Sequence, residues 1–168
     1  GFCTVCEKAC EHEDYANGFC ADCGVFEPAT LNEDGVYEIS NAGQLYWFAD
    51  KVNNDNANFG SANAVLTADI VVNEGVMDEN STDARAWTPI GSDSNQYTGT
   101  FDGNGKTVSG LYFNNSEASF VGLFGGVGTN GTVKNIGVIN SYFNGYDYVG
   151  GVAGYCYDST IANCYNTG

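Results

Sequence analysis

Basic residues are scarce in this sequence. Its 168 residues include five Lys and Arg against 21 Asp and Glu, which gives a formal net charge of −16 at pH 7. Proteins that bind nucleic acids or anionic membranes need clusters of positive charge. The composition therefore excludes nucleic acid as a partner. No apolar run approaches the roughly 20 residues of a bilayer span, so we expect no membrane insertion in this chain.

Charged residues of both signs amount to only 15% of the chain, and Gly, Asn, Thr and Tyr take their place. Helix surfaces usually carry Glu, Lys, Arg and Ala, whereas strands favour Thr, Tyr and β-branched residues. The composition thus predicts an all-β fold. Its excess of acid would also suit weak calcium binding, but no segment has the EF-hand spacing.

Cysteine is absent between Cys23 and Cys156, and five of the seven cysteines lie in the first 24 residues. This boundary predicts a Cys-rich module at residues 1–27, a linker at 28–35 containing Pro28 and an Asp34–Gly35 turn, and a separate domain at 36–168.

The N-terminal module contains two similar Cys-x-x-Cys pairs, in "GFCTVC" and "GFCADC", separated by 13 residues. Two such pairs offer four thiolates to one tetrahedral zinc ion, which predicts a small zinc-ribbon-like module. Its ligands would be Cys3, Cys6, Cys20 and Cys23. Cys10 and His12 compete, and Cys10, His12, Cys20 and Cys23 form a second ligand set. Disulfide bonds and a redox role are further alternatives for the same cysteines.

A single amphipathic helix is expected near the start of the larger domain. Asn41 and Gln44 have the spacing of a helix N-cap, and Leu45, Phe48, Ala49 and Val52 then recur at helical intervals. We expect a helix from about Ala42 to Asn53, preceded by a short strand at 36–39. Residues 64–72 ("AVLTADIVV") are expected to form one strand.

The last part of the chain repeats itself. Thr132–Ile136 ("TVKNI") and Thr160–Cys164 ("TIANC") match at an offset of 28 residues, and Thr107–Leu111 ("TVSGL") matches as an earlier copy. Such periods without helical spacing predict a right-handed parallel β-helix, a solenoid with one coil per repeat. In this register Val108 would stack on Val133 and Ile161, and Leu111 on Ile136 and Cys164. The helix would cap the first coil.

Two segments, "FVGLFGGVGTNGTVKNIGV" and "YVGGVAGYCYDSTIANCYNTG", resemble the GLUG repeat of bacterial secreted and cell-surface proteins. "WTPIG", "YTGTFDGNGKTVSGL" and "ISNAGQLYWFADKVN" are similar to the segments that precede such repeats. "CEHEDYANGFCADCG" resembles a small Cys/His module found ahead of repeats in secreted bacterial proteins. The resemblance covers roughly residues 35–168. It implies an extracellular, adhesin-like, non-catalytic scaffold.

Catalytic groups are few. His12 is the only histidine, which excludes a second histidine-based site if it binds metal. Polysaccharide-active enzymes also use the β-helix fold, so such an enzyme is the alternative function. A hydrolase needs two carboxylates, and the best single candidate, Asp102 in "FDGNG", lies in a turn sequence. We therefore expect no enzymatic activity.

Tyrosine and asparagine crowd the last repeat, and tyrosine offers a large contact area with a hydrogen-bonding tip. Tyr146, Tyr148, Tyr155 and Tyr157 are the candidate ligand-binding residues. The expected function is binding or display at the cell surface or outside the cell, with a host or matrix glycan or protein as partner. A purely structural stalk is a further alternative. We also expect the natural protein to continue into further repeats or an anchor.

Overall fold

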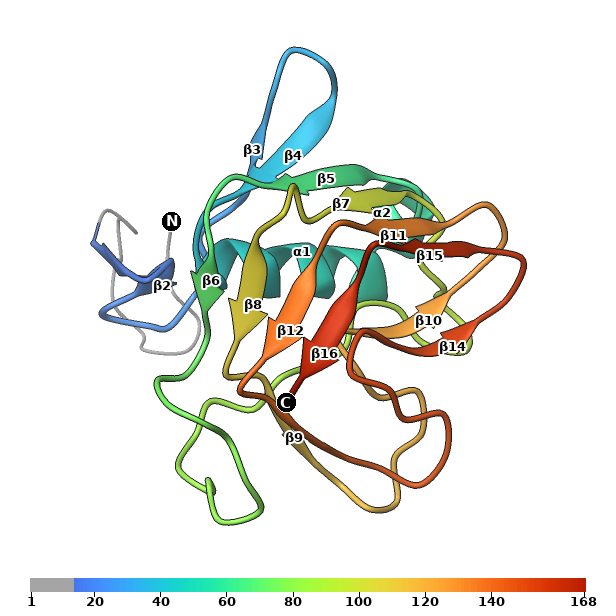
Figure 1. Ribbon diagram of the computed structural model, residues 1–168. Helices are drawn as coiled ribbons and strands as arrows, with labels where there is room; N and C mark the ends of the chain where they lie inside the picture. The colour runs from blue at the N-terminus through green and yellow to red at the C-terminus, as the bar shows by residue number, and fades with distance from the viewer. Residues whose placement is uncertain (1–13) are drawn as a thin grey trace.

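The computed structural model describes residues 14–168, which form a sheet-rich structure with two helices (Figure 1). The helices are α1 (Ala42–Asn54) and α2 (Asn56–Phe59). The strands before residue 100 are β1 (Tyr15–Ala16), β2 (Phe19–Cys20), β3 (Thr30–Leu31), β4 (Val36–Ile39), β5 (Asn63–Leu66) and β6 (Ile70–Val71). The later strands are β7 (Thr100–Asp102), β8 (Thr107–Ser109), β9 (Tyr112–Asn114), β10 (Phe124–Val127), β11 (Thr132–Lys134), β12 (Gly137–Ile139), β13 (Tyr142–Asn144), β14 (Ala153–Cys156), β15 (Thr160–Ala162) and β16 (Tyr165–Thr167).

The later strands belong to four sheets in a repeating order, and we call each pass through these sheets a coil. Consecutive strands β10, β11, β12 and β13 belong to four different sheets, and β14, β15 and β16 return to the first three in the same order. Each returning strand pairs in parallel with its predecessor. The largest sheet, ordered β15-β11-β7-β5-β4-β3, is mixed because β3 pairs with β4 antiparallel. Figure 1 shows β8, β12 and β16 side by side as one layer in front of α1.

The 28-residue offset predicted from the sequence is the observed register between the last two repeats. Thr132 pairs with Thr160, and Val133 pairs with Ile161. The placement of the earlier copy was wrong, however, because Thr132 pairs on its other side with Thr100. Thr107 lies in a different sheet, where it pairs with Gly137.

In each of the two predicted interior ladders, the residue from the earlier copy was therefore also misplaced, whereas Val133 pairs with Ile161 as predicted. Val108 stacks on Val138 rather than Val133. Leu111 donates its backbone N–H to the Ser141 hydroxyl and so lies next to Ser141, not Ile136. The cause is that each coil carries two short apolar strands close together, and the threonine–aliphatic pattern begins both β8 and β11.

The predicted helix is confirmed as α1. The Asn41 side chain accepts a hydrogen bond from the Gln44 N–H at 2.9 Å, and the Gln44 side chain accepts one from the Ser40 N–H at 2.8 Å. These contacts satisfy N–H groups at the start of the helix. On its buried face, Phe48 packs against Tyr97 and Phe101 in the interior.

Two other segments differ from the expected secondary structure. Residues 64–72 form two strands of different sheets, β5 and β6, with a corner between them at Asp69. The expected linker contains β3, which forms a hairpin with β4. Phe19 and Ala29 belong to the same core as α1. The predicted division of the chain into a module at residues 1–27, a linker at 28–35 and a domain at 36–168 stays a prediction.

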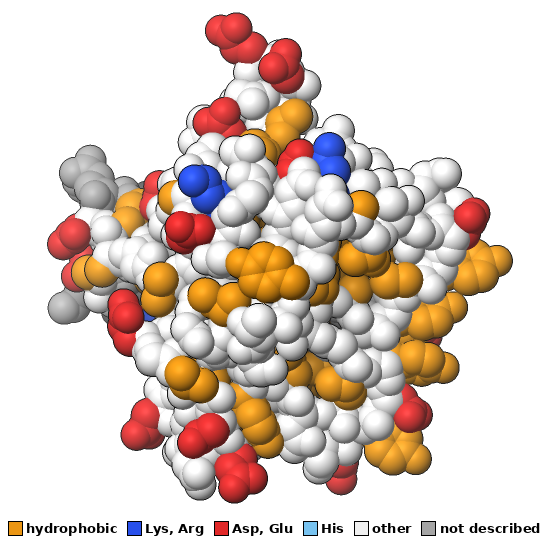
Figure 2. Space-filling view, viewed as in Figure 1, with side chains coloured by type: hydrophobic (Ala, Val, Ile, Leu, Met, Phe, Trp, Pro, Cys, Tyr) orange, Lys and Arg blue, Asp and Glu red, His pale blue; other side chains and the backbone are white. Residues whose placement is uncertain are grey.

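Side chains in the interior become more exposed toward the last coil. Phe101 and Val133 are fully buried, whereas their ladder neighbour Ile161 is 38% exposed. β15 and β16 each end their sheet. The last coil therefore offers partly uncovered apolar positions, and Figure 2 shows hydrophobic side chains gathered on this face, with acidic side chains around its outline.

Candidate functional site

The cysteine module lies only partly within the described residues. Cys3, Cys6, Cys10 and His12 lie outside them. Cys20 and Cys23 flank a tight turn in which the Cys20 carbonyl accepts a hydrogen bond from the Gly24 N–H at 2.8 Å. Cys20 is buried and packs against Tyr15 and Cys23. Residues 14–168 contain no group of three or more His, Cys, Asp or Glu able to hold a metal ion, so the ligand set stays a prediction.

Three aromatic rings from two neighbouring coils form a surface that we call the aromatic ledge: Phe120, Tyr148 and Tyr155. The ring centroids of Phe120 and Tyr148 lie 4.9 Å apart, and Tyr155 lies 5.6 Å from Phe120 and 5.4 Å from Tyr148. Tyr148 is 52% exposed, while the other two rings are half-buried. The structure thus brings together two of the four tyrosines expected to bind a ligand.

The other two expected tyrosines, Tyr146 and Tyr157, do not join the ledge. They are 72% and 59% exposed, and neither ring packs on another aromatic ring within the described part of the chain. Phe120 was not predicted from the sequence, although its position one repeat before Tyr148 was a usable signal.

The ledge is held by the backbone of two neighbouring coils. Val121 donates its N–H to the Tyr148 carbonyl at 2.9 Å, and Phe120 donates to the Asp147 carbonyl at 3.1 Å. Phe120 and Tyr148 both have left-handed backbones, with φ of 62° and 54°. This conformation is unusual for bulky residues and costs free energy. The buried Val121 and Leu123 keep the segment in place.

A pocket of about 310 Å³ borders the ledge at Phe120. Its walls come from the loop at residues 88–94, from α1 and from the segment that ends at Phe120. The lining residues include Asn53, Thr88, Ser92, Asp93, Ser94, Phe113 and Ser119.

Asn53 of α1 fixes the loop that forms this pocket. Its side chain accepts a hydrogen bond from the Gly91 N–H at 2.8 Å and donates one to the Pro89 carbonyl at 2.9 Å. Asn95 donates in turn to the Asn53 carbonyl at 2.7 Å. The backbone of the loop is therefore attached to the helix.

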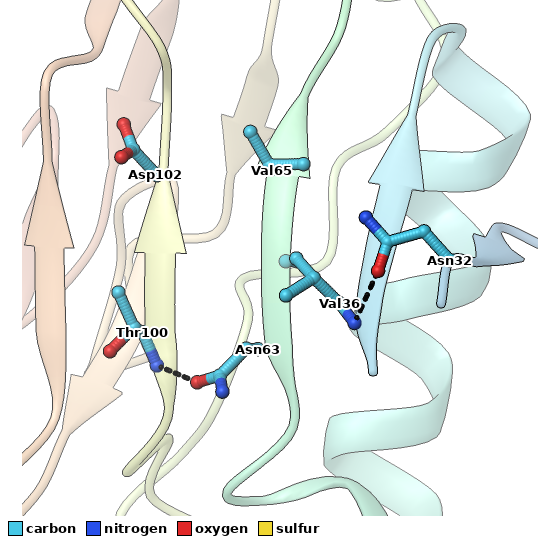
Figure 3. Close-up of a pocket in the computed structure, with 7 residues that line it drawn as sticks. Asn32, Val36, Asn63, Val65, Thr100 and Asp102 are labelled. Carbon is cyan, nitrogen blue, oxygen red and sulfur yellow. Dashed lines mark hydrogen bonds between the residues drawn. The ribbon is translucent and has the colours of Figure 1, made fainter. Parts of the chain in front are cut away.

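A second, shallow groove of about 420 Å³ lies on the outer face of β4, β5 and β7 (Figure 3). Val36 and Val65 supply its apolar surface. Its amide side chains are already engaged, because Asn63 accepts a hydrogen bond from the Thr100 N–H at 2.9 Å and Asn32 accepts one from the Val36 N–H at 3.0 Å. These contacts stabilise the strand ends and leave few polar atoms of the groove for a ligand.

Asp102 at the edge of this groove is also engaged. One carboxylate oxygen accepts hydrogen bonds from the Asn104 N–H at 2.8 Å and from the Asn135 side chain at 3.0 Å, and the other lies 3.2 Å from the Lys134 ammonium. Burial acts to raise the pKa of Asp102, but the contacts with Asn135, Asn104 and Lys134 outweigh it and hold the pKa below its ordinary value. Asp102 thus has the turn role expected from its sequence and also links neighbouring coils.

Comparison with known proteins gives two similar segments. "Halomucin" of Haloquadratum walsbyi is 37% identical over 119 residues, which is 70% of this chain but 1% of that protein. "Putative Gly-rich membrane protein" of Evansella cellulosilytica is 38% identical over 56 residues, 33% of this chain and 6% of that protein. The chain therefore spans only a small part of these relatives.

No family model and no solved structure matches the chain. Neither helix in residues 14–168 combines the length and apolar character of a membrane span.

Proposed function

We propose that this chain is part of a secreted or cell-surface, adhesin-like protein that binds or displays rather than catalyses. The observation that carries the proposal is the aromatic ledge, in which Phe120 of one coil packs against Tyr148 and Tyr155 of the next and the Tyr148 ring is exposed. The names of the two relatives, "Halomucin" and "Putative Gly-rich membrane protein", support a location at the surface.

The scaffold that we propose is a right-handed parallel β-helix of the GLUG-repeat type. Two observations support this scaffold: successive strands enter the sheets in the same order in each coil, and equivalent strands of successive coils pair in parallel. Right-handed connections between parallel strands are the general rule. In such a scaffold every coil places a further copy of its surface residues beside the last, which suits display.

The net charge of the chain limits the chemical classes of partner that it can bind. A net charge of −16 repels acidic polymers at low ionic strength. We therefore propose a neutral or basic partner, a host or matrix glycan or protein, and no nucleic acid.

A structural zinc ion is part of the proposal for the N-terminal module. Cys20 and Cys23 flank one turn, as a pair of zinc ligands would. We expect about one zinc per chain by elemental analysis, and we expect a strong chelator to expose reactive thiols. A zinc-free protein whose thiols react only after reduction would show disulfides instead.

Binding screens test the proposed function directly. The purified chain would be applied to immobilised neutral and acidic glycans and to collagen, fibronectin and laminin, with a heat-denatured sample as the control. The proposal expects saturable binding to at least one neutral glycan or matrix protein. Failure on every surface would contradict a binding role and leave a structural stalk.

A further inference from the structure

We propose that the aromatic ledge and the pocket beside it form one binding site for a neutral oligosaccharide. This inference rests on the proposed binding function and names the ligand class for that site. Phe120 belongs to both parts, because it lines the pocket and its ring packs against Tyr148 and Tyr155.

The ledge supplies the apolar half of such a site. The C–H faces of a pyranose ring are apolar and pack on aromatic rings, whereas its edge carries hydroxyls. Tyr148 is exposed over half of its surface, and Tyr155 meets it edge-on at 78° between ring planes. Tyrosine rings combine contact area with a hydroxyl and lose little conformational freedom on binding.

The pocket supplies the polar half. The side chains of Asp93 and Ser94 are exposed in it and make no hydrogen bond to protein atoms within residues 14–168. A carboxylate accepts two hydroxyl donors, and a serine hydroxyl both donates and accepts. The volume of about 310 Å³ lies at the lower end of small-molecule sites. Since Asn53 fixes the surrounding loop, little ordering is needed on binding.

The local charges favour an uncharged sugar. Asp93 lies in the pocket, and the exposed Asp147 directly precedes Tyr148. Among residues 14–168, no Lys or Arg lines the pocket. An acidic sugar would therefore meet like charge without a compensating cation, so uronic-acid polymers are poor ligands for this site.

The backbone conformation adds a separate argument for the ledge. Phe120 and Tyr148 occupy equivalent positions in neighbouring coils, and both keep a left-handed backbone that glycine would adopt without strain. Strain of this kind is stored where the side chain has a role that compensates for it. Here the left-handed backbone directs both rings onto the same ledge.

Isothermal titration calorimetry of the full chain tests the site with four probes: cellotetraose, mannotetraose, chitotetraose and tetragalacturonate. The variants are Tyr148→Gly and Asp93→Asn. Tyr165→Ala is the matched control, because Tyr165 is also 52% exposed but lies in β16, away from the pocket. Glycine relieves the left-handed backbone at position 148, which offsets the loss of ring packing on Phe120 and Tyr155, so we expect Tyr148→Gly to fold with a melting temperature close to that of the wild type.

The inference expects at least one neutral tetrasaccharide to bind the wild type, at least tenfold weaker binding by Tyr148→Gly and Asp93→Asn, and unchanged binding by Tyr165→Ala. The site is refuted if all three neutral probes fail to bind, if only tetragalacturonate binds, or if Tyr148→Gly binds as the wild type does. Binding of the same samples to matrix proteins separates the two proposals. If the wild type binds a matrix protein but none of the three neutral tetrasaccharides, this site is refuted and the proposed function stands.

Discussion

At the scale of single residues, asparagine makes the corners of the coils. Several asparagines adopt the left-handed conformation with φ between 52° and 55°: Asn104, Asn135, Asn140 and Asn163. Asparagine tolerates this region better than other side chains because it can hydrogen-bond locally. Asn163 donates to the Asn135 side chain at 3.1 Å, and Asn135 donates to Asp102. The many asparagines of the sequence thus link one coil to the next.

The corner at Gly110 requires glycine and would not accept asparagine. Its φ is 74°, and an added Cβ would collide with the backbone of Asn73 on the neighbouring coil. Both the dihedral angle and the close approach therefore require glycine. Any larger residue would force the two coils apart at this point.

The corner at Asp69 predicts a dependence of stability on pH. Its carboxylate accepts hydrogen bonds from the N–H and the hydroxyl of Thr107, at 2.8 and 3.1 Å. The N–H bond is the main cause that lowers the pKa of Asp69, followed by the hydroxyl bond. A lowered pKa adds stability above the unfolded value of about 4, and that stability is lost as the pH falls through the folded value.

We therefore expect Asp69→Ala to melt below the wild type at about pH 6, with the difference shrinking below about pH 4. Thermal denaturation across this range measures it. Asp34→Ala is the control, because the Asp34 side chain is exposed and accepts no hydrogen bond within residues 14–168. A difference for Asp69→Ala that stays constant with pH would contradict the role of its carboxylate.

At the scale of elements, one interior ladder runs through three coils, and its last residue is partly exposed to solvent. Phe101 and Val133 are fully buried, and Ile161 is 38% exposed. The cost of removing an apolar side chain depends on how much of it is buried and on the cavity left behind.

This ladder predicts unequal costs for two similar truncations. Val133→Ala should lower the free energy of unfolding by about 2 kcal/mol, whereas Ile161→Ala should cost less than about 1 kcal/mol although it removes more atoms. Urea denaturation of the two variants measures both values. Equal losses, or a larger loss at Ile161, would show that the last coil is covered in solution.

The sequence predicted those elements whose signals are local. The N-cap of α1 needs only Asn41 and Gln44, and the offset between the last two repeats follows from near-identical segments. The register of Thr107 was not predictable in the same way. The threonine–aliphatic pattern begins both β8 and β11, and the corner at residues 103–106 between β7 and β8 is longer than the one between β11 and β12. A residue pattern identifies a strand. The partner of that strand also depends on the lengths of the corners before it, which the pattern does not show.

The candidate site was predictable only in part for a related reason. Tyr148 and Tyr155 were expected from the tyrosine-rich last repeat. Phe120 joins them because Val121 and Val149 pair across neighbouring coils. Asp93 and Ser94 belong to a polar turn with no motif. The hydrogen bonds of Asn53 and the bridge between Ile90 and Phe124 bring that turn beside the ledge. Such contacts between distant segments are not visible in one sequence.

At the scale of the whole molecule, the two ends of the stack of coils differ. α1 packs its apolar face on the interior residues Tyr97 and Phe101, whereas β15 and β16 are the last strands of their sheets. The aromatic ledge combines Phe120 of one coil with Tyr148 and Tyr155 of the next. The proposed site therefore exists only if neighbouring coils are stacked in the observed register.

Engineered disulfides measure this register directly, because two cysteines form a bond only when their Cα atoms lie within about 7 Å. The structure predicts that Thr100→Cys with Thr132→Cys forms the bond on mild oxidation, as shown by mass spectrometry of the peptides. The pair Thr107→Cys with Thr132→Cys should stay unlinked, because these residues lie in different sheets. Linkage of the second pair and not the first would contradict the observed stacking of coils, and with it the proposed binding site.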